Sequence, residues 1–193
     1  MIPMADRFKQ ALRLTCQQIR KRLSPSYQQR ASWQICTNVR KLDQYRCAKR
    51  IALYYSVSGE INLSSLWQSA PLQGKYCYFP ALNDNRTLSF LPAMPSTPFK
   101  KNHYGIEEPD VARELAIPPE QLDVMLIPLV AFDSRGTRLG MGAGYYDRTL
   151  AQLRPQLLVG VAYEFQRQSF IEAGTFDVPL DVVVTEHATY WRK

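Results

Sequence analysis

The sequence predicts a three-layer α/β fold with a mostly parallel central sheet. Short apolar runs suited to buried strands alternate with stretches of helical periodicity along the whole chain, which is the order of elements typical of α/β proteins. The run LLVGVA at residues 157–162 is continuously apolar, as in a strand covered on both faces. Because 193 residues are enough to bury one sizeable core, we expect a single domain over residues 1–193.

Two amphipathic helices are predicted near the N-terminus. The first covers residues 6–23, and its expected buried face consists of Phe8, Leu12, Ile19 and Leu23. Lys9 and Arg13 lie four residues apart, side by side at the edge of that face. They are either solvated charges or cations that reach over a phosphate pocket. A second helix is expected at residues 25–42, because Ser24 and a proline suit its first turn.

The remaining predicted elements are short. Strands are expected at residues 49–56, 75–80, 88–91, 125–130, 157–162 and 181–185, and helices at 63–70 and 147–153. Residues 92–109 contain four prolines and are expected to be irregular. Because long loops in compact domains are usually functional or mobile, Lys100, Lys101 and Tyr104 are candidates to contact an anionic aromatic ligand. A solvated loop is the alternative, and His103 receives no assignment.

Composition narrows the class of protein. The net charge of +7 suits nucleic acid or small polyanions such as ATP, but the basic helices lack the aromatics of a single-strand binder. Four scattered cysteines and two histidines argue against a zinc site. No apolar run approaches the length of a membrane span, and residues 1–13 carry charge and lack the apolar region of a secretion signal. We therefore expect a cytoplasmic monomer that binds small molecules and neither nucleic acid nor membranes.

A glycine-rich segment lies between a predicted strand and a predicted helix. It consists of Arg138, Leu139, Gly140, Met141, Gly142, Ala143, Gly144, Tyr145, Tyr146 and Asp147. Anions bind at such turns because backbone N–H groups and the helix N-terminus converge there. Glycines at alternate positions let a phosphate approach the backbone, since no Cβ intervenes. The segment therefore predicts a phosphate-binding loop.

Charged residues flank these glycines. Arg138 offers bidentate donors to phosphate oxygens, and Asp147 offers a hard oxygen ligand of the kind that Mg²⁺ prefers. The segment lacks the Gly-Lys-Ser/Thr ending of a Walker A loop, and Tyr145 stands where a dinucleotide-binding loop needs its last glycine. A purely structural turn is the alternative, which the flanking arginine and Tyr-Tyr-Asp disfavour.

Glu60 follows the strand predicted at residues 49–56. Ligands bind at the carboxyl ends of strands in open α/β sheets, so Glu60 is a candidate to contact a polar substrate. Alternatively, its charge stabilises the N-terminus of the helix predicted at residues 63–70. The residues alone leave these two interpretations equal.

The segment RLGMGAGYYDRTL, after an apolar strand that ends in Phe132-Asp133, resembles the signature of the 5-formyltetrahydrofolate cyclo-ligase family. The resemblance extends over nearly the whole chain. Lys9 and Arg13 resemble the ATP-contacting pair near the family's N-terminus. Residues 55–60 (YSVSGE) resemble its strand-plus-glutamate segment at the folate site, and residues 104–109 (YGIEEP) resemble its central G-I-x-E-P motif.

This resemblance implies a Rossmann-like fold and an ATP-dependent cyclisation of 5-formyltetrahydrofolate to 5,10-methenyltetrahydrofolate, with Mg²⁺ as cofactor and ADP and phosphate as products. The implied ATP-binding residues are Lys9, Arg13, Arg138, Leu139, Gly140, Met141, Gly142, Ala143, Gly144, Tyr145 and Tyr146. The implied substrate-binding residues are Tyr55, Glu60, Tyr104, Met141, Gly142, Ala143, Gly144 and Tyr145. By the same resemblance, Arg138, Tyr145 and Asp147 act in catalysis, and Asp147 and Asp181 hold the metal.

Ala143 departs from the family pattern, because some members have lysine at this position. Any role of that lysine is either absent here or supplied by Lys100 or Lys101. Two other functions are compatible with the residues. A sugar-phosphate isomerase or coenzyme A transferase relative has a similar sheet and needs no ATP. A basic nucleic-acid-binding module would bind DNA or RNA with steep salt dependence.

Overall fold

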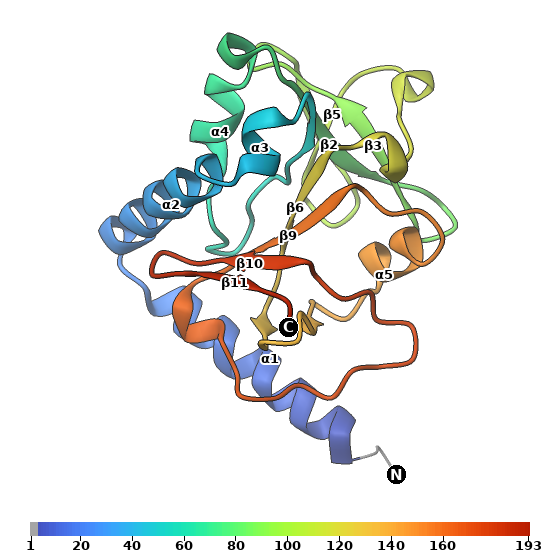
Figure 1. Ribbon diagram of the computed structural model, residues 1–193. Helices are drawn as coiled ribbons and strands as arrows, with labels where there is room; N and C mark the ends of the chain where they lie inside the picture. The colour runs from blue at the N-terminus through green and yellow to red at the C-terminus, as the bar shows by residue number, and fades with distance from the viewer. Residues whose placement is uncertain (1–3) are drawn as a thin grey trace.

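The computed structural model describes residues 4–193 and is built on a seven-stranded sheet. Its strands are β1 (Arg50–Ala52), β2 (Tyr76–Leu82), β3 (Leu88–Pro92), β6 (Val124–Pro128), β9 (Leu157–Val161), β10 (Val182–Val184) and β11 (Thr189–Trp191). Their order is β11-β10-β9-β6-β1-β2-β3 (Figure 1). The five inner strands run parallel, and only the edge strands β3 and β11 pair antiparallel. The predicted α/β class and mostly parallel sheet are therefore confirmed.

Helices lie on both faces of this sheet. The α-helices of residues 4–193 are α1 (Met4–Arg22), α2 (Pro25–Arg40), α3 (Asp43–Cys47), α4 (Ser64–Ser69) and α5 (Tyr145–Leu150), of which α1 lies beyond the sheet, against a hairpin. Figure 1 shows α2, α3 and α4 on one side and α5 on the other. Successive side chains of a strand point to opposite faces, so Val124 and Leu126 of β6 pack on the α2 side, whereas Met125 and Ile127 pack beside Leu150 of α5. The three layers expected from the sequence are present.

Helix α2 forms as its sequence predicts. The Ser24 side chain accepts a hydrogen bond from the Tyr27 N–H, and Pro25 occupies the first turn, where its missing N–H costs nothing. Ala31, Ile35 and Val39 are buried against the sheet. The helix ends at Arg40, two residues before the predicted boundary.

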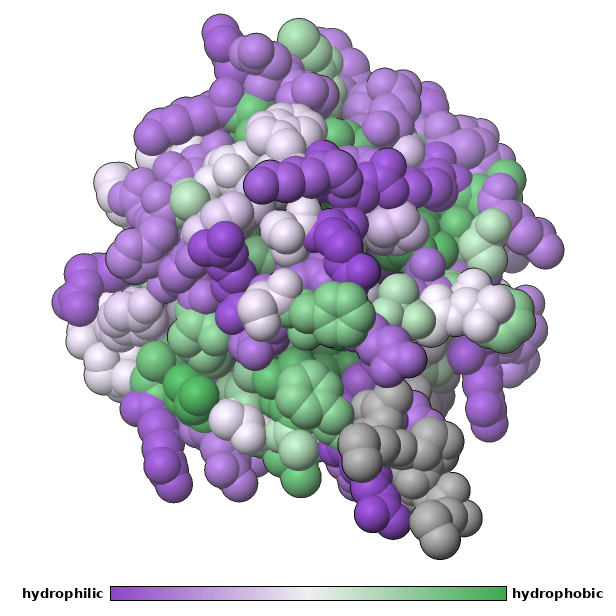
Figure 2. All heavy atoms as spheres, turned by 60° about the horizontal axis from the view of Figure 1, so that its bottom comes forward, coloured by the Kyte–Doolittle hydropathy of each residue, from purple (hydrophilic) through white to green (hydrophobic). Residues whose placement is uncertain are grey.

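The predicted buried face of α1 was wrong in part. Phe8 is 56% exposed and Ile19 is 40% exposed, whereas Cys16 and Arg20 are buried. The helix packs on a hairpin rather than on the sheet, with Leu12 beside it, so a different stripe faces inward. Figure 2, viewed from the α1 end, shows hydrophobic side chains at the surface among hydrophilic ones. The inner stripe of α1 therefore carries basic side chains toward the interior.

Two hairpins flank the sheet. The first pairs β7 (Ala131–Phe132) with β8 (Arg138–Leu139) and leads into the glycine-rich segment. The second pairs β4 (Phe99–Lys101) with β5 (Glu107–Pro109), in a stretch expected to be irregular. Buried Glu108 anchors it by accepting hydrogen bonds from the Leu82 N–H and from Asn102 Nδ2. None of the helices in residues 4–193 is long and apolar enough to cross a membrane, and residues 1–3 lie outside the described part of the chain.

Candidate active site

A cavity of about 760 Å³ lies at the carboxyl ends of β1 and β6, within the range of small-molecule sites. Tyr54 and Tyr55 reach it from the end of β1, and Pro128 and Leu129 reach it from the end of β6. The β4–β5 hairpin and the glycine-rich segment form further walls. The cavity is thus at the position where open α/β sheets bind their ligands.

The predicted site residues meet in this cavity with one exception. Those that line it are Lys9, Arg13, Tyr55, Glu60, Tyr104, Arg138, Leu139, Gly140, Met141, Gly142, Ala143, Gly144, Tyr145, Tyr146 and Asp147. They come from α1, from the turn after β1, from the β4–β5 hairpin and from the β8–α5 segment. The exception is Asp181, and Asp177 lines the cavity in its place.

The glycine-rich segment joins β8 to α5 and needs glycine for its conformation. Gly142 has φ +104° and Gly144 has φ +71°, both in the region that disfavours residues with a Cβ. Arg13 of α1 contacts this loop, because its Nε donates a hydrogen bond to the Gly140 carbonyl oxygen at 2.9 Å. The Arg13 guanidinium also lies beside Gly142, where a Cβ would be 3.8 Å from its Cζ. Arg13 therefore adds a positive charge to the loop that the sequence predicts to bind phosphate.

Arg138 is occupied by protein partners. Its Nη2 lies 2.5 Å from Asp147 Oδ1, and its Nη1 donates to the Val178 carbonyl oxygen. Only 4% of the Arg138 side chain is exposed. Burial lowers the pKa of Arg138, and the negative charges of Asp147 and Asp177 oppose that change. Two of the donors that the sequence assigns to phosphate are therefore already used within the protein, although Arg138 does line the cavity.

Asp147 retains a free oxygen. Both of its hydrogen bonds, from Arg138 and from the Val178 N–H, end on Oδ1. No residue in the described part of the chain donates to Oδ2. Asp177 also lines the cavity, and its hydrogen bond from the Gly174 N–H uses Oδ2 only. Residues 4–193 contain no cluster of three or more metal-ligating side chains, so any cation here would need ligand oxygens from elsewhere.

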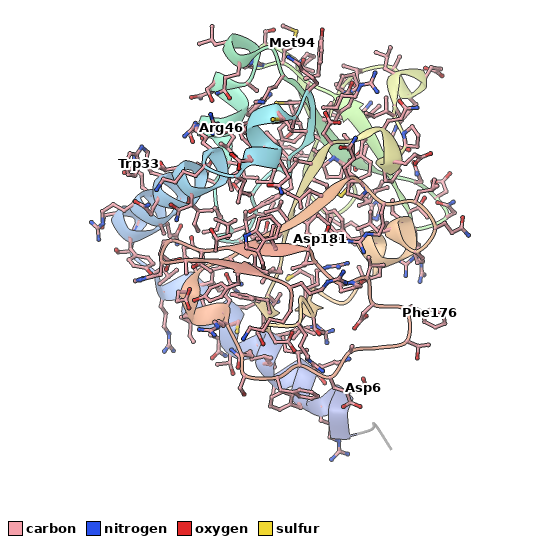
Figure 3. The ribbon with its side chains drawn as sticks, in the orientation of Figure 1. Asp6, Trp33, Arg46, Met94, Phe176 and Asp181 are labelled. Carbon is pink, nitrogen blue, oxygen red and sulfur yellow. The ribbon has the colours of Figure 1, made fainter. Side chains whose placement is uncertain are left out.

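Asp181 is not part of this site. Its carboxylate pairs with Arg154 at 2.9 Å and accepts the Leu158 N–H at 2.8 Å. It precedes β10 at the amino ends of the strands, opposite to the cavity, and Figure 3 labels it beside the sheet. The expectation that Asp181 holds a metal therefore finds no support in its position. Asp177 was not singled out from the sequence. It lies four residues before Asp181, in a short segment with neither helical nor strand periodicity.

Glu60 points into the cavity and does not cap α4. Its carboxylate accepts the Val57 N–H at 3.1 Å and lies 3.8 Å from Arg20 Nη1. The α4 start is instead served by the Asn62 side chain, which accepts the Ser64 N–H. Burial raises the pKa of Glu60, while the Arg20 charge and the Val57 N–H act in the opposite direction. The substrate-contact interpretation is therefore favoured over the helix-end one.

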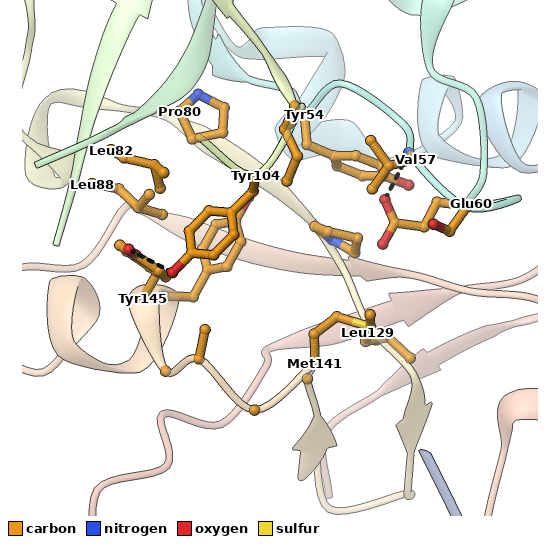
Figure 4. Close-up of a pocket in the computed structure, with 18 of the residues that line it drawn as sticks. Tyr54, Val57, Glu60, Pro80, Leu82, Leu88, Tyr104, Leu129, Met141 and Tyr145 are labelled. Carbon is orange, nitrogen blue, oxygen red and sulfur yellow. Dashed lines mark hydrogen bonds between the residues drawn. The ribbon is translucent and has the colours of Figure 1, made fainter. Parts of the chain in front are cut away.

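The opposite side of the cavity is aromatic and aliphatic. In Figure 4, Tyr104, Tyr145, Leu82 and Leu88 lie across the cavity from Glu60. The two tyrosine hydroxyls are 3.4 Å apart and join the hairpin tip to α5. Neither leucine was singled out from the sequence, because both belong to short strands whose pairing decides which face they occupy.

The lysines of the hairpin lie outside the cavity that Ala143 lines. Lys100 pairs with Asp110 at 2.7 Å, and neither it nor Lys101 lines the cavity. His103 packs on the Tyr104 ring outside the lining. A different cation lies beside Ala143, because Arg148 Nη2 donates to its carbonyl oxygen.

Comparison with known proteins decides the family. Residues 5–186 match the family model described as the 5-formyltetrahydrofolate cyclo-ligase family. The chain belongs to this family. A 5-formyltetrahydrofolate cyclo-ligase of Haemophilus influenzae is 40% identical over 91% of this chain and 97% of its own. One of Escherichia coli K12 is 34% identical over 87% of this chain and 94% of its own.

Solved structures agree with this assignment. The 5,10-methenyltetrahydrofolate synthetase of Aquifex aeolicus superposes with a TM-score of 0.83 at 33% identity, over 95% of this chain and 92% of that chain. The Mycoplasma pneumoniae enzyme of the same name gives 0.75 at 30% identity, over 92% and 98%. The alternatives of an isomerase or transferase relative and of a nucleic-acid-binding module are therefore set aside.

Proposed function

We propose that this protein converts 5-formyltetrahydrofolate to 5,10-methenyltetrahydrofolate with consumption of ATP and with Mg²⁺ as cofactor. The proposal rests on the residues that line one cavity. A glycine loop, basic side chains of α1 and the carboxylates of Asp147 and Asp177 line one part of it, and an apolar, aromatic wall and Glu60 line the rest. Such a cavity has room for a triphosphate beside a pterin, so both substrates meet in one place.

The glycine loop and α1 would hold the triphosphate. Amide groups of the loop approach phosphate oxygens closely where no Cβ intervenes. Lys9 and Arg13 supply positive charge from the rim of the same cavity, and charge-assisted bonds to phosphate are the strong ones. These groups position the γ-phosphoryl group and neutralise the charge that moves during its transfer, which is most of what this chemistry requires.

The carboxylates fit a magnesium ion that a nucleotide brings with it. Mg²⁺ in such sites takes one or two protein carboxylates and completes its shell with phosphate oxygens and water. Asp147 and Asp177 each keep one oxygen without a protein donor in the described residues. When bound there, the ion would offset phosphate charge. Arg138 would keep Asp147 oriented by the ion pair described above.

The other half of the cavity would hold the folate. Leu82 and Leu88 offer apolar surface, and Tyr104 and Tyr145 offer ring faces and hydroxyl groups. Glu60 is a buried carboxylate that can accept hydrogen bonds from N–H donors of the pterin or of the chain beside the formyl group. Glu60 thereby sets the orientation in which the formyl oxygen meets the γ-phosphate.

The proposed reaction has two steps. The formyl oxygen first attacks the γ-phosphorus and releases ADP, which turns that oxygen into a good leaving group. N10 then attacks the formyl carbon, phosphate leaves with the former formyl oxygen, and N10 loses its proton. The protein contributes position, charge and exclusion of water rather than a covalent intermediate.

A spectrophotometric assay tests this function. The conjugated product is expected to accumulate from 5-formyltetrahydrofolate only when ATP and Mg²⁺ are both present, with one ADP formed for each product. Chelation of the metal should stop the reaction, and added Mg²⁺ should restore it. Product formed at the same rate without ATP, or no product under any of these conditions, would refute the proposal.

A further inference from the structure

Arg20 is a buried cation beneath the folate half of the cavity. It lies on the inner stripe of α1 and is 2% exposed. Its Nη1 is 3.8 Å from Glu60 Oε1, too far for a hydrogen bond but close for two charges. Its Nε and Nη2 are buried and have no hydrogen-bond partner among residues 4–193. Burying a guanidinium with unpaired donors lowers stability, so packing alone does not account for an arginine here.

The turn before Glu60 is held against this arginine. A Cβ at Gly59 would lie 3.3 Å from Arg20 Cγ, which shows how closely the turn packs on the aliphatic part of the side chain. From the other direction, the Tyr163 hydroxyl donates to the Gly59 carbonyl oxygen. Arg20 therefore contacts the turn that carries Glu60, and it does so without lining the cavity itself.

Three tyrosines also interact electrostatically with the carboxylate of Glu60 and are neutral near physiological pH. They are Tyr54 after β1, Tyr163 after β9 and Tyr146 of α5, and the hydroxyls of Tyr54 and Tyr163 donate to the Ile61 and Gly59 carbonyl oxygens on either side of Glu60. Burial raises the pKa of Tyr163 to about 12 and raises those of Tyr54 and Tyr146 as well. Cys16, which faces Arg20, also has its pKa raised by burial. The charge that opposes the desolvation of Glu60 thus comes from Arg20.

We propose that Arg20 is a positioning residue that keeps Glu60 ionised and aimed into the folate compartment, so that the pair rather than Glu60 alone recognises the N–H donors of the substrate. This inference rests on the proposed function, in which Glu60 contacts the folate. A protonated glutamic acid has one acceptor oxygen fewer and presents a donor instead. Loss of Arg20 would favour this neutral form, because the carboxyl group stays buried.

The test compares Arg20→Met, Arg20→Gln and Arg20→Lys over a range of about pH 5 to 9, which spans the titration expected for a buried glutamate. The first two should raise the KM for 5-formyltetrahydrofolate, by about tenfold for each unit by which the assay pH lies below the raised pKa of Glu60. That loss should fade as pH increases, because the carboxylate then forms again. Arg20→Lys keeps the charge and should stay near the wild-type pH profile. The KM for ATP should change little in all three.

Two controls separate this role from a structural one. Lys21→Met removes an exposed cation from the next position of α1 and should leave the pH profile unchanged. In a Glu60→Gln background, Arg20→Met should cause no further loss of folate affinity, because no carboxylate remains to be ionised. Calorimetric titration of 5-formyltetrahydrofolate without ATP gives a second measurement of the same affinities.

The inference is overturned if Arg20→Met and Arg20→Gln keep the wild-type pH dependence of folate binding, or if their losses are equally large in the Glu60→Gln background. Should Arg20→Met fail to fold, Arg20→Gln and Arg20→Lys still decide, since only the charged substitute should keep the profile. Failure of the proposed function would look different, because the wild-type protein itself would then neither bind 5-formyltetrahydrofolate nor form the methenyl product.

Discussion

Arg138 and Asp147 form a 2.5 Å ion pair that uses a single oxygen of the carboxylate. The same Oδ1 accepts the Val178 N–H at 3.1 Å, so the segment that carries Asp177 is joined to the start of α5. Oδ2 has no donor among residues 4–193. One oxygen of Asp147 therefore holds the architecture of the site, while the residue lines the cavity and its other oxygen remains without a protein donor in the described part of the chain.

We expect Asp147→Asn to lower turnover strongly and to raise the Mg²⁺ concentration needed for half-maximal rate, while the fold is retained. The amide oxygen can still accept from Arg138, so the stability loss should be only about 1–3 kcal/mol, as for a weakened charge-assisted hydrogen bond. Turnover measured against Mg²⁺ concentration, together with a melting curve, checks both parts.

Asp181→Asn is the matched control for this prediction. It removes a carboxylate that pairs with Arg154 away from the cavity, so it should lower the melting temperature without changing the Mg²⁺ requirement. An unchanged requirement in Asp147→Asn, or an equal change in Asp181→Asn, would move the metal site away from Asp147.

Arg13→Ala is expected to weaken ATP binding selectively. The substitution removes the hydrogen bond to the Gly140 carbonyl oxygen and a cation beside the loop, which together should cost about 1–3 kcal/mol of ATP affinity. Folate affinity should change much less. Arg22→Ala, which removes an exposed arginine of the same helix, is the control and should alter neither. A drop in melting temperature with unchanged ATP affinity in Arg13→Ala would assign this arginine to structure instead.

Gly142→Ala should destabilise the loop, whereas Gly140→Ala should not. At Gly142 φ is +104°, and an alanine there costs roughly 1–2 kcal/mol or distorts the backbone. At Gly140 a Cβ would meet nothing within 4 Å. Thermal unfolding of the two variants measures this difference directly. A larger loss of stability in Gly140→Ala than in Gly142→Ala would mean that backbone conformation is not the reason for glycine at position 142.

The parts of the site that could be predicted from the sequence are those with a local signal. The segment 138–147 shows its glycines, its arginine and its aspartate in one stretch, between an apolar strand and a short helix. Glu60 could be placed near a ligand because it follows a strand by a short turn. These features depend on neighbours in sequence, so a pattern of residues describes them well.

The parts that were missed depend on tertiary contacts. Nothing in the helical periodicity of α1 shows that it packs on the β7–β8 hairpin, so Phe8 was expected in the buried face and Arg20 was not singled out. Asp177 and Asp181 flank the same short segment, and only the strand register places one at the cavity and the other at the amino end of β10. The β4–β5 hairpin was not predicted, because the four prolines of residues 92–109 indicated irregular structure. One of them, Pro109, lies at the end of the hairpin, where proline is tolerated.

Glu60→Gln should weaken binding of 5-formyltetrahydrofolate by about 1–3 kcal/mol, because substrate donors lose a charged acceptor in a buried site. ATP affinity should be nearly unchanged. Separate titrations with 5-formyltetrahydrofolate and with a nonhydrolysable ATP analogue measure the two affinities. Unaltered folate affinity with lower stability at every pH would mean that Glu60 stabilises its own turn through the Val57 N–H and does not bind the folate.

The same variant makes a prediction about stability without ligand. Burial raises the pKa of Glu60 in the folded state, against the partial opposition of Arg20 and the Val57 N–H, so the folded protein binds this proton more tightly than the unfolded chain. Its contribution to stability is therefore complete below the unfolded pKa and is lost as pH rises through the folded pKa.

Glutamine does not titrate, so the melting temperature of Glu60→Gln minus that of the wild type should increase with pH across this window and then level off. Any constant offset from leaving Arg20 without its partner cancels in that change. Melting curves over this window provide the measurement, with the exposed Glu120→Gln as the control for the loss of a carboxylate far from Arg20. A difference between Glu60→Gln and the wild type that stays flat or decreases with pH contradicts a raised pKa at Glu60.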